Sequence, residues 1–151
     1  LLELGRSCVH PDHRGGAAMY LMWNALADYV IEQGIQILFG VASFHGTDMT
    51  ALAMPLSYLH HHHLAPEALR ARALADRFQP MNLVPLDRLD RTAAMKATPA
   101  LIKAYLRLGG FVGEGAVIDH AFNTTDVLLM MDTAAMSERH RGYYTRRSAG
   151  N

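Results

Sequence analysis

The sequence has little cysteine, no excess charge of either sign and no long apolar run. Cys8 is the single cysteine, so an internal disulfide framework is excluded and a reducing compartment is indicated. Lys plus Arg and Asp plus Glu both number 14, so bulk charge gives no argument for nucleic acid as a partner. The longest apolar stretch, 35–44, is far shorter than the roughly 18 residues of a membrane span. We therefore expect a cytoplasmic protein that binds no nucleic acid.

Length and composition indicate one folded domain. Half of the 151 residues are hydrophobic and 19% are charged, which excludes a largely disordered chain. This length is enough for one domain with a real core and not comfortably for two. The sequence has no initiator Met and opens as a strand without a preceding turn. We therefore expect it to begin inside a larger domain.

The first part of the chain has the pattern of a βαβ unit. Residues 1–9 predict a strand, 10–16 a turn with Pro and Gly, 17–33 a helix and 35–44 a buried strand. In such a unit the two strands are parallel and the crossover is right-handed.

The rest of the chain predicts more helices and two adjacent strands. In chain order these are helices over about 50–63 and 98–110, strands over 111–122 and 124–132, and a helix from about 133. Asp48 is a candidate N-cap for the first of them. Residues 64–98 are interrupted by prolines and predict only short elements.

The turn between the first strand and helix is a candidate anion site. Unpaired backbone amides and the helix dipole both favour a phosphate at a helix N-terminus that follows a Gly-containing turn. The stretch "VHPDHRGGAA" supplies Val9, Pro11, Arg14, Gly15 and Gly16 to such a turn. A plain βα turn with no ligand explains this stretch equally well when it is taken alone.

Four consecutive histidines, His60 to His63, stand in the middle of the chain. On a helix at most two of them share a face. Zinc sites need three or four ligands at spacings such as H-E-x-x-H, and this run contains no Glu. A tag would lie at a terminus. We interpret the run as a native helix end that holds no metal, where histidine cations would also suit the helix dipole.

Several motifs resemble a known superfamily. "V-x-P-x-x-R-G" at 9–15 is similar to the acyl-donor motif of GNAT acyltransferases, and "AYLRLGGF" at 104–111 resembles the helix-to-strand passage late in that fold. "ELGRSCV" at 3–9 is similar to the Glu-x-x-Arg strand of acyl-homoserine lactone synthases, which are GNAT relatives. Together with "MPLSYLHHHHLAPE" and "LIKAYLRLGGFVGEGAVIDHAFNTTDVLL", these blocks resemble the L-ornithine Nα-acyltransferases of ornithine-lipid synthesis, a family often labelled hemolysin-like.

The resemblance implies an α/β fold of GNAT type, with a central mixed sheet and flanking helices. Family members carry further strands and helices upstream of "ELGRS", so 1–151 would be the C-terminal portion of a single domain whose N-terminal strands are missing. Residues 64–98 would be a family-specific insertion.

The resemblance also implies catalytic roles. Glu3 is the candidate base for the attacking amine, since an α-amine has a pKa of roughly 8 and an ammonium cannot attack. Its alternative is an ion-paired or surface carboxylate. Arg6 would hold a carboxylate or the donor, or pair with Glu3. Because GNAT enzymes transfer the acyl group directly, Cys8 is expected to be a buried strand residue rather than a nucleophile.

The donor would bind at the turn. Its expected contacts are Val9, Arg14, Gly15 and Gly16. The superfamily usually has Gly at the positions of Ala17 and Met19, where the backbone closes on a pyrophosphate. Larger residues there favour the single phosphate of an acyl carrier protein over coenzyme A, although acyl-CoA stays open as a donor. No other cofactor and no metal is expected.

The acceptor needs an anion for its side-chain ammonium. Asp48 and Asp126 are candidates, with helix or turn capping as their alternative role. Asp119 and His120 could line the acceptor pocket or form a structural hydrogen-bonded pair.

The expected function is transfer of a 3-hydroxyacyl group from acyl carrier protein to the α-amine of ornithine, which gives lyso-ornithine lipid. Acyl carrier proteins are acidic, so Arg14, Arg139, Arg141, Arg146 and Arg147 are candidates for a basic docking surface. Peripheral contact with the inner face of the membrane is compatible with such a product. The alternatives are another amino acid, acyl-CoA as donor, or a non-catalytic hemolysin-like binding protein.

Overall fold

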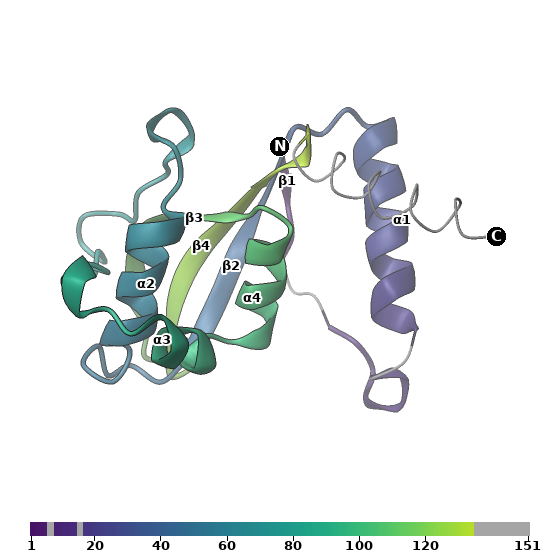
Figure 1. The fold of residues 1–151 in the computed structure, drawn as a ribbon. Coiled ribbons are helices and arrows are strands. Elements are labelled where there is room, and N and C mark those ends of the chain that lie inside the picture. The colour runs from purple at the N-terminus through teal and green to yellow at the C-terminus, as the bar shows by residue number, and fades with distance from the viewer. Residues whose placement is uncertain (6–7, 15–16, 135–151) are drawn as a thin grey trace.

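The computed structural model describes residues 1–5, 8–14 and 17–134, and these form a mixed sheet with helices against it. The strands are β1 (Leu2–Glu3), β2 (Ile37–His45), β3 (Phe111–Asp119) and β4 (Thr124–Asp132). Their order in the sheet is β1-β2-β4-β3. β1 is parallel to β2 and the other neighbours are antiparallel, so the predicted parallel pair and mixed sheet are confirmed (Figure 1).

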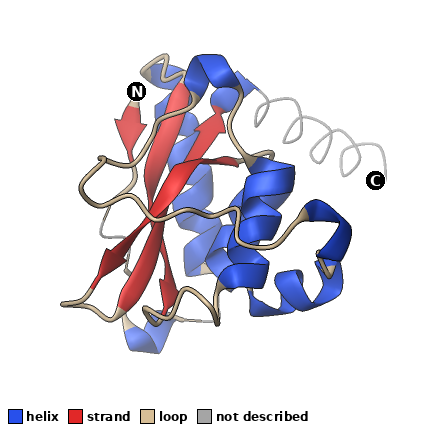
Figure 2. Cartoon of the chain, turned by 90° about the vertical axis from the view of Figure 1, so that its left-hand side faces the viewer, coloured by secondary structure: helices blue, strands red, loops and turns tan. Residues whose placement is uncertain are grey.

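The helices are α1 (Ala18–Glu32), α2 (Ala53–His63), α3 (Arg91–Ala97) and α4 (Ala100–Arg107). Three short 3-10 turns, Pro11–His13, Glu67–Leu69 and Leu86–Arg88, lie in the connections. Figure 2 shows the helices packed against the twisted strands. None of the helices in the described ranges is long and apolar enough to cross a membrane. The helix predicted from about residue 133 falls almost wholly in 135–151, outside the described residues.

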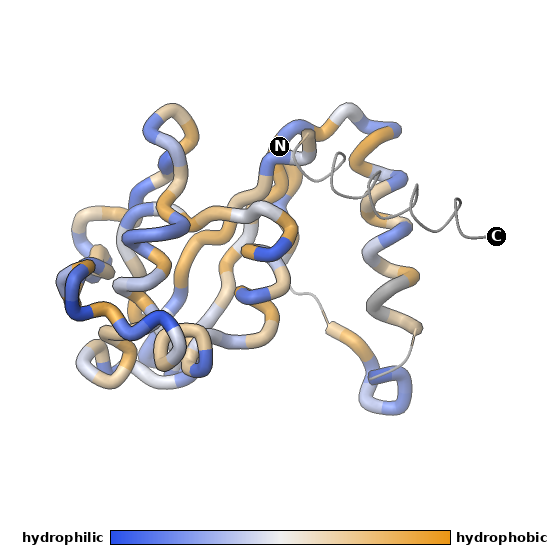
Figure 3. Tube along the Cα trace, in the orientation of Figure 1, coloured by the Kyte–Doolittle hydropathy of each residue, from blue (hydrophilic) through white to orange (hydrophobic). Residues whose placement is uncertain are grey.

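The core lies on one face of the sheet, because alternate residues of a strand point to opposite faces. Leu38, Ala42 and Phe44 of β2 are buried beneath the helices. Val41, on the other face of the same strand, is 62% exposed. The alternation of apolar and polar segments along the tube is visible in Figure 3. The two faces of the sheet therefore have different surroundings.

β1 is much shorter than the predicted strand over 1–9. Its ladder with β2 covers Leu2 and Glu3, and the Leu4 amide donates a last bond to the Phe39 carbonyl at 2.7 Å. Beyond this point the chain leaves β2 toward the turn and α1 (Figure 1). Cys8 follows the strand and is exposed, so its expected burial was wrong. β1 and β2 therefore separate just before the turn that leads to α1.

The start of α2 also differs from the prediction. α2 begins at Ala53 with Leu52 as its N-cap. Asp48 instead accepts bonds from the amides of Thr50 and Ala51, at 2.8 and 3.3 Å, and so caps the turn before α2. The predicted N-cap was therefore placed one turn too early.

Residues 64–79, the first part of the segment 64–98, run along the outer edge of β3. Isolated bridges join Leu64 to Val112, Arg72 to Glu114 and Gln79 to Ala116. The segment contains two of the 3-10 turns and α3, as the prediction of short elements requires. It extends the sheet where β3 would otherwise have an open edge.

Ser57 fastens this segment to α2. Its hydroxyl is fully buried and donates to the Met81 carbonyl at 3.0 Å. The same oxygen accepts bonds from the amides of Leu83 and Val84, at 2.9 and 2.8 Å. One side chain therefore satisfies three backbone groups of a segment that has little regular structure of its own.

We expect Ser57→Ala to lower the free energy of unfolding by about 1–3 kcal/mol, because it leaves two partly buried amides and the Met81 carbonyl without their bonds to Ser57. Urea unfolding followed by circular dichroism measures the change. Ser43→Ala, at an exposed position of β2, is the matched control and should change it little. Equal stability of Ser57→Ala and wild type would contradict the proposed anchoring role.

The four histidines form the last turn of α2, as predicted. The His62 and His63 rings lie 4.9 and 5.4 Å from the Tyr58 ring. His61 Nε2 lies 3.0 Å from the Val84 carbonyl oxygen and can donate to it. Among the described residues no group of three or more His, Cys, Asp or Glu is placed to hold a metal ion.

Burial lowers the pKa of His60 and of His63, and neighbouring His61 and His62 lower these pKa values further. The unfolded chain, with its ordinary pKa of 6.5, therefore takes up protons at a pH where the folded protein does not. The contribution of both groups to stability is complete above pH 6.5 and is lost as the pH falls below it.

The melting temperature should therefore drop between pH 7.5 and pH 5, and the drop should be smaller in the double variant His60→Gln/His63→Gln. Differential scanning calorimetry at both pH values tests this. His45→Gln, at an exposed strand end, provides the control. An equal drop in wild type and double variant would show that other groups cause the acid sensitivity.

Candidate active site

The turn before α1 is closed by its own polar groups. Pro11–His13 forms a 3-10 turn, and the Asp12 amide donates to His10 Nδ1 at 3.4 Å. Arg14 Nε donates to the Val9 carbonyl at 2.9 Å. This bond brings the arginine back across the turn and, among the described residues, leaves its two terminal nitrogens without a protein partner.

α1 begins directly after this turn. Its N-cap, Ala17, provides no side-chain bond, and no acidic residue occupies the first turn. The first amides of a helix have no intrahelical acceptor and carry a partial positive charge. The helix end and the exposed Arg14 can together bind an anion. Arg6, Gly15 and Gly16 lie outside the described residues, so their predicted roles stay predictions.

A cavity of about 510 Å³ opens between this turn and the sheet. Cys8 and Val9 line it from the side of the turn, and Gly40 and Val41 from β2. Its other walls come from α1, α4 and β4, and include Trp23, Leu26, Leu101, Tyr105 and Met131. The lining is mostly apolar, so the cavity suits an apolar chain more than a charged group. Below, it is called the donor cavity.

Two aromatic rings from different helices meet at the donor cavity. Trp23 of α1 and Tyr105 of α4 contact edge to face, with ring centroids 5.4 Å apart. Burial raises the pKa of Tyr105, so its phenol is neutral at physiological pH. This contact joins α1 to α4 across the cavity. β1 does not hold the two sides together here, because its hydrogen bonds to β2 end at Leu4.

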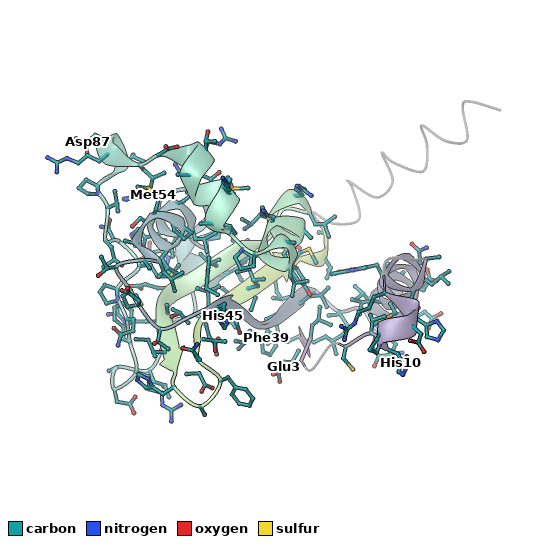
Figure 4. All side chains as sticks on the ribbon, turned by 90° about the horizontal axis from the view of Figure 1, so that it is seen from below. Glu3, His10, Phe39, His45, Met54 and Asp87 are labelled. Carbon is teal, nitrogen blue, oxygen red and sulfur yellow. The ribbon has the colours of Figure 1, made fainter. Side chains whose placement is uncertain are left out.

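Glu3 lies on the face of the sheet opposite the helices. Its register partner on β2 is Phe39, while Leu2 pairs with the core residue Leu38. Residues directly paired across two strands point to the same face. Figure 4 shows Glu3 beside Phe39, with His10 farther away near α1. Glu3 is exposed, and it precedes the point where β1 leaves β2.

The predicted acceptor residues separate into two groups. Asp48 follows β2, Asp119 ends β3 and His120 follows it, all at the end of the sheet away from the pairing of Glu3 with Phe39. Asp119 accepts bonds from the amides of Ala121 and Phe122, so it caps the turn between β3 and β4. His120 is exposed beside it.

Asp126 differs from these capping residues. It lies inside β4, opposite Ser43 of β2 and Val117 of β3. Its Oδ1 is buried and has no hydrogen-bond partner among the described residues. The structure therefore does not bring all four predicted acceptor residues together.

The cavity walls from α4 and the close approach at Gly40 were not recognised in the sequence. A Cβ on Gly40 would lie 2.4 Å from the Leu4 carbonyl oxygen. A glycine inside an apolar strand is a known signal of close backbone approach, and "ILFGVASF" contained it. The motif "AYLRLGGF" includes Tyr105 but did not mark it as a cavity residue, because that position depends on its contact with Trp23 of α1.

The chain is similar in sequence to known proteins. Residues 1–24, from β1 through the turn into α1, match the model of the Acetyltransferase (GNAT) domain. A protein of Rhodobacter capsulatus named L-ornithine N(alpha)-acyltransferase is 71% identical over 99% of this chain and 57% of its own length. Proteins of the same name from Brucella abortus and Agrobacterium fabrum are 44% and 43% identical over 95% of this chain. No solved structure matches the chain.

The mixed sheet, the flanking helices and the family match give the chain an α/β fold of GNAT type, as the sequence predicted. It is homologous, over nearly its whole length, to proteins named L-ornithine N(alpha)-acyltransferase. The resemblance inferred from the motifs is confirmed. The chain spans about half the length of these curated relatives.

Proposed function

We propose that the protein transfers a fatty acyl group, of the 3-hydroxyacyl type, from acyl carrier protein to the α-amine of ornithine. The donor cavity carries this proposal, because a mostly apolar space of about 510 Å³ opens beside a turn that can bind an anion. A phosphopantetheine thioester has a phosphate at one end and an acyl chain at the other. The names of the relatives support ornithine as the acceptor.

In this reaction the acceptor's amine nitrogen attacks the thioester carbonyl carbon. A C–N bond forms, the C–S bond breaks and the pantetheine thiol leaves. The ammonium form must first lose a proton, and Glu3 is the candidate base because it lies where β1 and β2 begin to separate. The nitrogen loses a second proton as the amide forms, and this proton goes to the leaving thiolate. The first proton passes from Glu3 to solvent. No covalent intermediate on Cys8 is needed.

Arg14 and the amides at the start of α1 would bind the phosphate. Ala17 and Met19 occupy positions where GNAT enzymes that bind a pyrophosphate usually have Gly. This favours acyl carrier protein, with its single phosphate, over acyl-CoA. The expected docking arginines 139, 141, 146 and 147 lie outside the described residues, which leaves Arg14 as the described candidate. A lipid product is compatible with peripheral contact at the inner face of the membrane.

Product analysis tests the proposal. The full-length protein is incubated with 3-hydroxypalmitoyl acyl carrier protein and a mixture of amino acids, and N-acyl products are identified by mass spectrometry. We expect lyso-ornithine lipid, with less product when acyl-CoA replaces the carrier protein. If the product were a different N-acyl amino acid, the acceptor would be that amino acid and not ornithine. Absence of any product with both donors would reject the acyltransferase function, and liposome leakage without acyl transfer would favour a membrane-active protein.

A further inference from the structure

A second cavity, of about 130 Å³, lies on the opposite face of the sheet from the donor cavity. The residues that decide its chemistry are Arg72, Glu114 and Asp126, and its walls include Val41, Gly113 and Leu128. Val41 also lines the donor cavity, so this residue of β2 contributes to the walls of both cavities.

The segment after α2 builds one wall of this cavity. Arg72 pairs with Glu114 of β3 through Nη1 and Oε1 at 2.5 Å, and its guanidinium lies 4.4 Å from the Phe78 ring centre. A Cβ on Gly113 would lie 2.9 Å from the Ala71 carbonyl oxygen. The glycine thus allows the segment to approach β3 closely enough for Arg72 to reach Glu114.

Asp126, which is partly buried, brings a carboxylate to this cavity. Its Oδ1 is buried without a hydrogen-bond partner among the described residues. A buried carboxylate oxygen without a partner is unfavourable and is rare in folded proteins. Arg72 neutralises Glu114, so two carboxylates and one guanidinium leave one negative charge. A single cation of small size would complete the cavity.

The sheet register relates this cavity to Glu3. Phe39, Val41 and Ser43 follow one another on the same face of β2, with Glu3 beside the first and Asp126 beside the third. Standard strand spacings give roughly 16 Å between the Cα atoms of Glu3 and Asp126. The two carboxylate side chains and an extended diamino acid between them can span this distance.

We propose that the second cavity binds the cationic side-chain end of the acceptor and that Asp126 is its counter-ion. This inference rests on the proposed function and assigns its acceptor specificity. The α-amine then extends toward Glu3 and the donor cavity. A neutral side chain of equal length would leave Asp126 unpaired, so the site selects an amino acid whose side chain ends in an ammonium.

Asp126→Asn tests the assignment because it removes the charge and keeps the shape. Initial rates of the full-length protein are measured with ornithine and with norvaline, which lacks the terminal amine. We expect kcat/KM for ornithine to fall about 30-fold or more, as when one partner of a buried ion pair is removed, with norvaline unchanged. Asp132→Asn, on the same strand and face, is the matched control. Its side-chain oxygen can still accept the bond from the Ala134 amide.

A binding measurement separates this inference from the reaction. Ornithine without a donor should raise the melting temperature of wild type more than norvaline does, and Asp126→Asn should abolish that difference. An unchanged preference for ornithine in both assays would overturn the role of Asp126 while the acyltransferase function stands. Equal losses with ornithine and norvaline would also overturn it, because a structural or catalytic defect does not distinguish them. A wild type that acylates no amino acid would reject the function itself.

Discussion

Glu3→Gln in the full-length protein should lower kcat/KM for acyl transfer to ornithine by about 10²–10⁴-fold, the usual contribution of a general base. The substitution keeps the size of the side chain and removes its basic oxygen. An α-amine has a pKa of roughly 8, so the residual rate of the variant should increase as the pH rises and more free amine is present. Initial rates of thiol release between pH 6.5 and pH 9.5 measure both effects.

Glu67→Gln is the matched control for this substitution, because Glu67 is exposed in a 3-10 turn outside both cavities. It should retain the wild-type rate and pH profile. Circular dichroism should show that Glu3→Gln folds, since Glu3 is exposed and its side chain is not part of the core. A Glu3→Gln rate within a few-fold of wild type over the whole pH range would exclude Glu3 as the base.

The βαβ unit was predictable because its parts depend on neighbours in the sequence. Apolar spacing predicted α1, and an apolar run predicted β2 within two residues at its start and one at its end. The length of β1 was not predictable in this way. Residues 1–9 have strand composition throughout, but a strand exists only while a partner accepts its hydrogen bonds, and β2 does so no further than Leu4.

The candidate site also has one part that could be predicted from the sequence and one part that could not. Its turn could be found from Pro11 and Arg14 at motif spacing, and the GNAT match over residues 1–24 includes both of them. The second cavity could not be found from the sequence. Arg72 and Glu114 are 42 residues apart, and their pairing depends on how the segment 64–98 follows β3. Asp126 was a candidate from its chemistry alone. Its buried Oδ1, which has no hydrogen-bond partner among the described residues and sets it apart from Asp48 and Asp119, appears only in three dimensions.

The second large effect is expected at Gly40, where β1 leaves the sheet. An added methyl group would lie 2.4 Å from the Leu4 carbonyl oxygen and 3.3 Å from its carbon, both backbone atoms that cannot rotate away. Gly40→Ala should therefore lower the free energy of unfolding by about 1–3 kcal/mol, as overpacking does. Because Leu4 and Gly40 both line the donor cavity, the same shift should weaken donor binding and raise KM for the acyl carrier protein.

Gly5→Ala separates this steric effect from the general consequence of replacing glycine. A Cβ on Gly5 would come no closer than 3.6 Å to its nearest neighbour, Glu3 Oε1. Gly→Ala at a compatible position stabilises a protein by about 0.4–1 kcal/mol through the unfolded chain. Urea unfolding should thus give opposite signs for the two variants. If Gly40→Ala were as stable as Gly5→Ala, β1 would be free to move away from β2. The separation of the strands would then be adjustable rather than fixed by their backbones.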